Sequence, residues 1–152
     1  MTLNSVLGKN WISKKYSEEI VNTLKDNFQL EEIPEVKFID HHLAHVGSSF
    51  FVSPFDEAAI MILDGRGESI STSLYKGKQN SVTKISEVKV PHSLGHLYAA
   101  ITDFLGFKPF FDEWKVMGMS AYGKEDYVDK FNDLIKLLPD GKFELNLEYF
   151  NF

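Results

Sequence analysis

The 152-residue sequence contains no cysteine, which excludes a disulfide framework, a thiolate zinc site and a cysteine nucleophile. It has no basic excess either. The 16 lysines and arginines stand against 22 aspartates and glutamates, and the resulting charge of −6 argues against a nucleic-acid-binding surface. The longest strictly apolar run, Ala58 to Leu63, is too short to cross a membrane, and the N-terminus lacks the layout of a signal peptide. We therefore expect a cytoplasmic protein that binds neither nucleic acid nor membranes.

Aromatic side chains, by contrast, are abundant: they make up 14% of the residues, with 13 phenylalanines. The apolar fraction of 43% is typical of a globular chain, and the length predicts a single domain over residues 1–152. The sequence ends on Tyr149-Phe150-Asn151-Phe152. Aromatic residues bury large areas, so this end is either a strand docked on a sheet or a cut inside a larger protein.

The periodicity of apolar residues predicts alternating helices and strands. The continuous apolar run 58–63 predicts a strand buried on both faces, and Gly65 and Gly67 predict a tight turn after it. Together the elements predict an α/β domain with a mixed β-sheet and flanking helices. One helix is expected to begin at residue 17, and further helices are expected over 41–51, 93–106, 114–121 and 128–138. Strands are expected over 36–39, 58–63, 70–74, 82–90 and 143–149.

Three histidines fall within the five residues 41–45. His41 and His45 are four residues apart and share one face of the expected helix. Two imidazoles at this spacing can clamp iron, zinc or a similar cation. A zincin motif is excluded, because His42 stands where that motif needs a glutamate. A solvated polar cluster and an anion site at the helix terminus remain as alternatives, and a metal site would need a third ligand from elsewhere.

A second segment with chemical potential is Asp64-Gly65-Arg66-Gly67-Glu68. Backbone N–H groups of a glycine turn can cradle phosphate, and an aspartate at the end of a strand can hold a cation. Asp64 is therefore a plausible third metal ligand. Asp-Gly is also common in hairpin turns, so a purely structural role stays open.

Two further segments carry weaker signals. His92 and His96 are again four residues apart, but Ser93 is more simply a helix N-cap and Gly95 more simply permits close helix packing. Glu113 and Lys115 could place an acid and a cation beside an anionic substrate, although ordinary helix chemistry also explains them. No Walker loop, nucleophile elbow or dinucleotide-binding glycine motif is present.

Together these segments resemble, in order and spacing, the O-carbamoyltransferases of the nodulation and antibiotic-tailoring type. The similarity extends from about Val36 to Gly123. The resemblance implies part of an N-terminal domain of the actin-like ATPase (ribonuclease H-like) superfamily, similar to the tRNA threonylcarbamoyl-transfer domain, and a chain that is a fragment of a larger enzyme. The segments concerned are His41–His45, Asp64–Glu68, Pro91–Gly95 and Glu113–Gly118.

The resemblance also implies a reaction. Such enzymes form carbamoyl adenylate from carbamoyl phosphate and ATP and pass the carbamoyl group to an acceptor hydroxyl, while a divalent metal, usually iron, holds the nucleotide phosphates. The implied metal ligands are His41, His45 and Asp64. The implied nucleotide-binding residues are Gly65, Gly67, Glu68 and Gly118. The implied catalytic residues are Glu113 and Lys115 near the substrate, with His42 as a general base.

The sequence departs from the family pattern in places. Ser120-Ala121 replaces an expected Ala-Pro, and His96 replaces an aliphatic residue. The first phosphate loop and the adenylate-forming domain are absent, so we expect no turnover by this chain alone and an exposed apolar surface that could make it a homo-oligomer. A non-catalytic metal- or nucleotide-binding module is the alternative. A metallohydrolase is disfavoured, because no carboxylate adjacent to the histidines could serve as its general base.

Overall fold

The computed structural model describes residues 11–28, 32 and 36–150. The chain divides into two compact units, Met1–Asp40 and His41–Phe152. The first unit contains helix α2 (Trp11–Phe28), which begins earlier than the predicted residue 17 because no glycine or proline interrupts the preceding residues. The predicted strand over 36–39 is wrong: residues 36–40 have no regular structure, since alternation alone does not make a strand without a paired neighbour.

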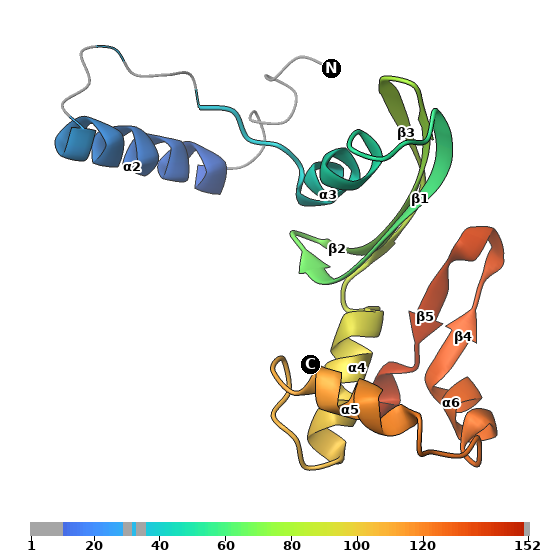
Figure 1. Cartoon of the computed structure of the whole chain (residues 1–152). Helices are drawn as coiled ribbons and strands as arrows, with labels where there is room; N and C mark the ends of the chain where they lie inside the picture. The colour runs from blue at the N-terminus through green and yellow to red at the C-terminus, as the bar shows by residue number, and fades with distance from the viewer. Residues whose placement is uncertain (1–10, 29–31, 33–35, 151–152) are drawn as a thin grey trace. The chain divides into compact units, whose positions relative to one another are not determined.

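The second unit is built on a three-stranded sheet in the order β1-β2-β3 (Figure 1). The strands are β1 (Glu57–Gly67), β2 (Ile70–Lys78) and β3 (Ser81–Lys89). Both pairings are antiparallel, with Met61 opposite Leu74 and Leu74 opposite Ser86. The α/β class is confirmed, whereas all strand pairings between described residues are antiparallel rather than mixed.

Helix α3 (His41–Phe50) covers one face of this sheet. Its buried Val46 and Phe50 pack on the inward-facing side chains of β1 and β2. On the opposite face of β1, Met61 is 60% and Leu63 is 56% exposed, so the predicted burial of this strand on both faces is wrong. The α3 side of β1 is covered while Met61 and Leu63 on the other side stay exposed, and β1 therefore alternates between buried and exposed residues.

The rest of the second unit packs around the end of β3. Helix α4 (Leu94–Phe104) contributes Leu97 to a second core cluster with Val88, Phe143 and Leu145. The remaining elements are helices α5 (Glu113–Ser120) and α6 (Val128–Leu134), strands β4 (Ile135–Leu137) and β5 (Phe143–Leu145), and 3₁₀ turns η1 (Pro139–Gly141) and η2 (Leu147–Tyr149). In the described part of the chain, no helix is long and apolar enough to cross a membrane.

Two boundaries near the C-terminus differ from the prediction. The helix expected over 128–138 stops at Leu134, because residues 135–137 pair with 143–145 in a short hairpin. The strand expected over 143–149 stops at Leu145, because the Asn146 side chain accepts a hydrogen bond from the N–H of Glu148 and initiates η2. In both cases a local turn overrides the apolar periodicity.

Candidate metal centre

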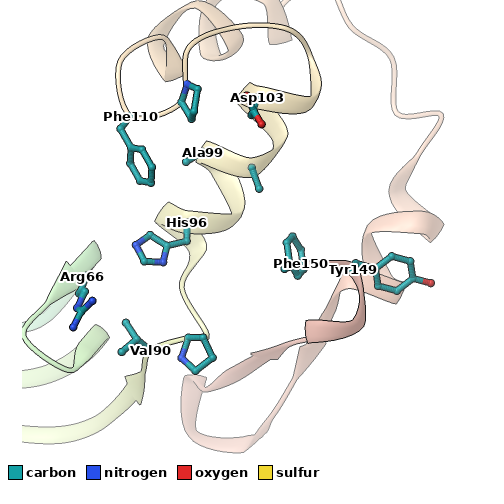
Figure 2. A pocket seen from close by; sticks show the side chains of 11 residues that line it. Arg66, Val90, His96, Ala99, Asp103, Phe110, Tyr149 and Phe150 are labelled. Carbon is teal, nitrogen blue, oxygen red and sulfur yellow. The ribbon is translucent and has the colours of Figure 1, made fainter. Parts of the chain in front are cut away.

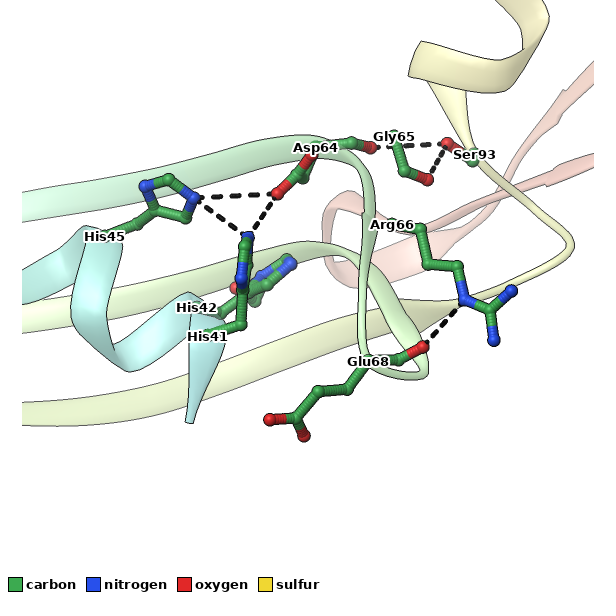
Figure 3. A network of polar contacts seen from close by, with 9 residues as sticks. His41, His42, His45, Asp64, Gly65, Arg66, Glu68 and Ser93 are labelled. Atoms are coloured by element: carbon green, nitrogen blue, oxygen red, sulfur yellow. Dashed lines mark hydrogen bonds and ion pairs between the residues drawn. The ribbon is translucent and has the colours of Figure 1, made fainter. Parts of the chain in front are cut away.

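His41 and His45 project from the first turns of α3 toward Asp64 on β1 (Figure 3). The Nε2 atom of His41 lies 2.6 Å from Oδ2 of Asp64 and 3.1 Å from Nε2 of His45. The Nε2 atom of His45 lies 3.6 Å from the same carboxylate oxygen. The structure therefore brings together the three residues that the sequence suggested as metal ligands; metal binding itself stays a prediction.

The spacing of these atoms fits a single cation. Atoms bound to one metal at about 2.0–2.2 Å lie roughly 3.0–3.5 Å apart in octahedral or tetrahedral geometry. The three donor atoms are all within 4.8 Å of one another, and their separations of 2.6, 3.1 and 3.6 Å scatter around that value. Two imidazoles and one carboxylate on one side of a cation are the donor set of non-haem iron(II) sites, which leave other positions open.

The environment of Asp64 favours its ionised form. Partial burial acts to raise the pKa of this carboxyl, but the hydrogen bond and charge of His41 and the backbone N–H groups of Gly65 and Arg66 together hold the pKa below its ordinary value. Asp64 is thus a carboxylate at neutral pH, as a cation ligand must be. The predicted phosphate cradle of backbone N–H groups at Gly65 and Gly67 stays a prediction.

An irregularity in β1 places Asp64. The register with β2 shifts between Leu63 and Gly67, so residues 64–66 bulge out of the ladder. The reversal follows at Glu68 and Ser69, rather than at Gly65 and Gly67 as predicted, and Glu68 adopts a positive φ of 58°. The Glu68 carboxylate points away from Asp64 in Figure 3, while its backbone carbonyl accepts a hydrogen bond from Arg66.

Two glycines allow the surrounding helices to approach this bulge. A Cβ atom on Gly67 would lie 2.6 Å from the rings of both His41 and His42, and a Cβ atom on Gly95 would lie 2.7 Å from Cα of Gly65. The hydroxyl of Ser93 donates to the carbonyl of Gly65 at 2.7 Å and accepts from the N–H of His96. Ser93 is thus the N-cap of α4, as the sequence indicated, and it fastens that helix to the bulge.

His42 faces the interior. It is 1% exposed, and its Nδ1 atom hydrogen-bonds to the hydroxyl of Ser73 on β2. A side chain this deeply buried is poorly placed to meet an acceptor hydroxyl, so its surroundings favour a structural role over that of a general base. His92 is likewise occupied, because its Nδ1 atom accepts the N–H of Leu145.

The remaining predicted residues make local contacts around α5. The Glu113 carboxylate accepts the N–H of Phe110, and the Lys115 ammonium lies 2.8 Å from Asp112. Gly118 lies in α5 with open space where a Cβ atom would be. None of the three belongs to the cluster of possible metal ligands among the described residues.

A cavity of about 720 Å³ lies beside the bulge (Figure 2). Arg66 of β1 and His96 of α4 both line the cavity. The His96 ring lies 3.7 Å from the position that a Cβ atom on Gly65 would take. Most of its lining is apolar. The residues involved are Arg66, Val90, Pro91, His96, Ala99, Ala100, Asp103, Pro109, Phe110, Tyr149 and Phe150.

Sequence reasoning missed this cavity. The sequence marks Arg66 only as part of a glycine-containing segment, and it marks His96 only by its spacing from His92 and by its departure from the family pattern. Nothing in the sequence signalled that Phe110 and Phe150, forty residues apart in the chain, line one space. The general rule that binding sites are apolar cavities with a few polar groups needs coordinates before it can be applied.

Fold and site together define an α/β protein in which two imidazoles and a carboxylate converge near a ligand-sized cavity. Comparison with known proteins gives the family. The family model described as "Carbamoyltransferase N-terminus" matches residues 2–152, and the chain therefore belongs to this family.

Several curated relatives support this membership. An uncharacterized protein of Synechocystis, sll1178, is 47% identical over 123 residues, covering 80% of this chain and 20% of the relative. The nodulation protein NolNO of Sinorhizobium fredii is 34% identical (82% and 18% covered). The nodulation protein NolO of Bradyrhizobium diazoefficiens is 31% identical (72% and 20% covered). The matches thus span about a fifth of these relatives' length.

Proposed function

We propose that this chain supplies a metal site and a nucleotide site to an O-carbamoyltransferase. The observation that carries the proposal is the convergence of His41, His45 and Asp64 on one point next to a cavity large enough for a nucleotide. Membership of the carbamoyltransferase family supports the reaction class.

His41 and His45 would bind a divalent cation through Nε2, and Asp64 would bind it through Oδ2, with iron(II) favoured by the donor set. When bound, such a cation withdraws charge from phosphate oxygens and makes the adenylate a better leaving group. The contact between His41 Nε2 and Asp64 Oδ2 at 2.6 Å keeps the Asp64 carboxylate oriented toward the histidines. The absence of a side chain at Gly67 lets α3 approach β1 closely enough for the imidazoles of His41 and His45 to reach Asp64.

The nucleotide, ATP or carbamoyl adenylate, would lie in the cavity. Its apolar walls suit a base, and the guanidinium of Arg66, which lines the cavity, suits phosphate. Because Arg66 lines the cavity and Gly65 and Gly67 are not among its lining residues, we assign phosphate recognition to the Arg66 side chain rather than to a cradle of amides at Gly65 and Gly67.

The proposed chemistry is carbamoyl transfer. The acceptor hydroxyl oxygen forms a bond to the carbamoyl carbon, the bond from that carbon to the adenylate oxygen breaks, and AMP leaves while the hydroxyl proton passes to a base. Carbamoyl phosphate and ATP are the proposed precursors. Since the chain spans about a fifth of its relatives, we propose that it binds metal and nucleotide but does not complete the transfer alone.

The test is metal titration by anaerobic calorimetry with iron(II). We expect one ion per wild-type chain, loss of binding in the His41→Ala, His45→Ala double variant and in Asp64→Asn, and unchanged binding in Asp126→Asn, which alters an exposed aspartate outside the cluster. Wild-type affinity in Asp64→Asn would refute the proposed centre. Binding of metal and ATP by a chain extended to the full length of its relatives, with no carbamoyl transfer from carbamoyl phosphate, would instead favour a non-catalytic binding module.

A further inference from the structure

Phe110 combines two unfavourable features. Its backbone φ is 63°, in the left-handed region that bulky side chains rarely adopt. Its ring is 68% exposed, so burial in a core does not explain the residue. Strained conformations of this kind persist where surrounding contacts enforce them, and they gather at binding sites.

The contacts that enforce this conformation come from the start of α5. The N–H of Phe110 donates to the Glu113 carboxylate. The Asp112 carboxylate accepts the N–H of Lys108, which precedes Phe110, at 3.1 Å. It also pairs with Lys115, which follows Phe110, at 2.8 Å. The backbone of the 108–113 connection is therefore held by two carboxylates before any ligand arrives.

The fixed ring is part of the cavity wall. Figure 2 shows Phe110 next to His96, and the two rings meet edge to face with their centroids 6.0 Å apart. His96 is partly buried beside Gly65. An exposed aromatic face at this position can take a flat ligand, and the small side chains of Ala99 and Ala100 in the same lining leave room for it.

We propose that Phe110 stacks on the base of the bound nucleotide and that Glu113 is the positioning residue that holds it there. This inference rests on the proposed function, because it assigns the base end of the same nucleotide. It also gives Glu113 a role as a hydrogen-bond acceptor, without proton transfer to or from the substrate.

The experiment is ligand-observed NMR on the 152-residue chain with ATP, and with inorganic tripolyphosphate as a probe that lacks a base. Base–aromatic stacking makes a substantial contribution to nucleotide binding, so Phe110→Leu is expected to weaken ATP binding about tenfold. It is also expected to reduce saturation transfer to the adenine protons and to leave tripolyphosphate binding unchanged. Phe110→Trp retains a stacking face and is expected to bind ATP like the wild type.

Glu113 is tested by a pair of variants. Glu113→Gln keeps an oxygen acceptor for the N–H of Phe110 and is expected to preserve ATP affinity, whereas Glu113→Ala is expected to lower it about as much as Phe110→Leu does. If Glu113 acted through its charge, Glu113→Gln would lose as much affinity as Glu113→Ala. Glu125→Gln, at an exposed carboxylate outside the cavity lining, is the matched control.

The outcomes separate this inference from the function on which it rests. Equal ATP affinity in the wild type and Phe110→Leu would overturn the stacking role while leaving the nucleotide site intact. Equal weakening of ATP and tripolyphosphate would also overturn it. A wild-type chain that binds iron(II) but no ATP would overturn the nucleotide site itself, and the stacking role with it.

Discussion

At the scale of single residues, the clearest constraint is Gly67. A Cβ atom there would lie 2.6 Å from the rings of His41 and His42, one of them deeply buried. We expect Gly67→Ala to push α3 away from β1, lowering the free energy of unfolding by about 1–3 kcal/mol and weakening metal binding. Urea unfolding and calorimetry measure both effects.

Gly118 provides the matched control for Gly67. It lies in helix α5 with open space at its Cβ position, so Gly118→Ala should be neutral or raise stability by up to about 1 kcal/mol through helix propensity. If Gly67→Ala behaved like Gly118→Ala in both measurements, the close approach of α3 to β1 would be disproved.

The contribution of Glu87 to the free energy of unfolding is expected to depend on pH. Partial burial acts to raise the pKa of this carboxyl, but Lys84, at 3.1 Å, and Lys89, at 3.6 Å, together hold the pKa below its ordinary value. A pKa that is lower in the folded than in the unfolded chain stabilises the fold above the unfolded pKa, and this contribution is lost as pH falls through the folded pKa.

Glu87→Gln should therefore lower the free energy of unfolding at pH 7 by roughly 0.5 kcal/mol, the scale of an exposed ion pair, and should have little effect in acid below the folded pKa. Urea unfolding of both proteins at several pH values measures the difference, and 1 M salt should shrink it at pH 7. A difference that is the same at all pH values would contradict the ion-pair origin.

At the scale of elements, the attachment of α4 to β1 is the contact that fixes the site. The Ser93 hydroxyl is buried, donates to the carbonyl of Gly65 and caps α4 through the N–H of His96. Replacing it by alanine should destabilise the fold by about 1–3 kcal/mol, because a cap is lost and a partly buried carbonyl loses a donor. Thermal unfolding tests this, with Ser120→Ala on the exposed face of α5 as the control. Equal melting temperatures for the two variants would refute the attachment.

The sequence predicts some of these elements correctly and others not. Helices α3 and α4 were predictable because apolar spacing and, for α4, a serine cap agree locally. The proximity of Asp64 to His41 was predictable only as a hypothesis, since it depends on α3 lying across the end of β1. The strand at 135–137 and the exposed face of β1 depend on which partners the fold brings, and no local pattern encodes them.

At the scale of the whole molecule, the apolar surface matters most. Met61 and Leu63 expose a large apolar area on the face of β1 opposite Ile60 and Ile62. Among the described strands, β1 pairs only with β2, so its other edge is open as well. An edge strand with an apolar face is a template for association with a second copy.

We therefore expect light scattering to show self-association that grows with protein concentration, together with binding of a hydrophobic dye. The double variant Met61→Lys, Leu63→Thr removes apolar area from exposed positions while keeping residues that a strand tolerates, so it should reduce association and dye binding with little loss of stability. Asp126→Asn changes the net charge by the same amount at an exposed position outside the sheet and should leave association unchanged. If Asp126→Asn reduced association equally, net charge and not the β1 surface would be responsible. A wild-type chain that stayed monomeric without binding dye would show that this surface does not drive association.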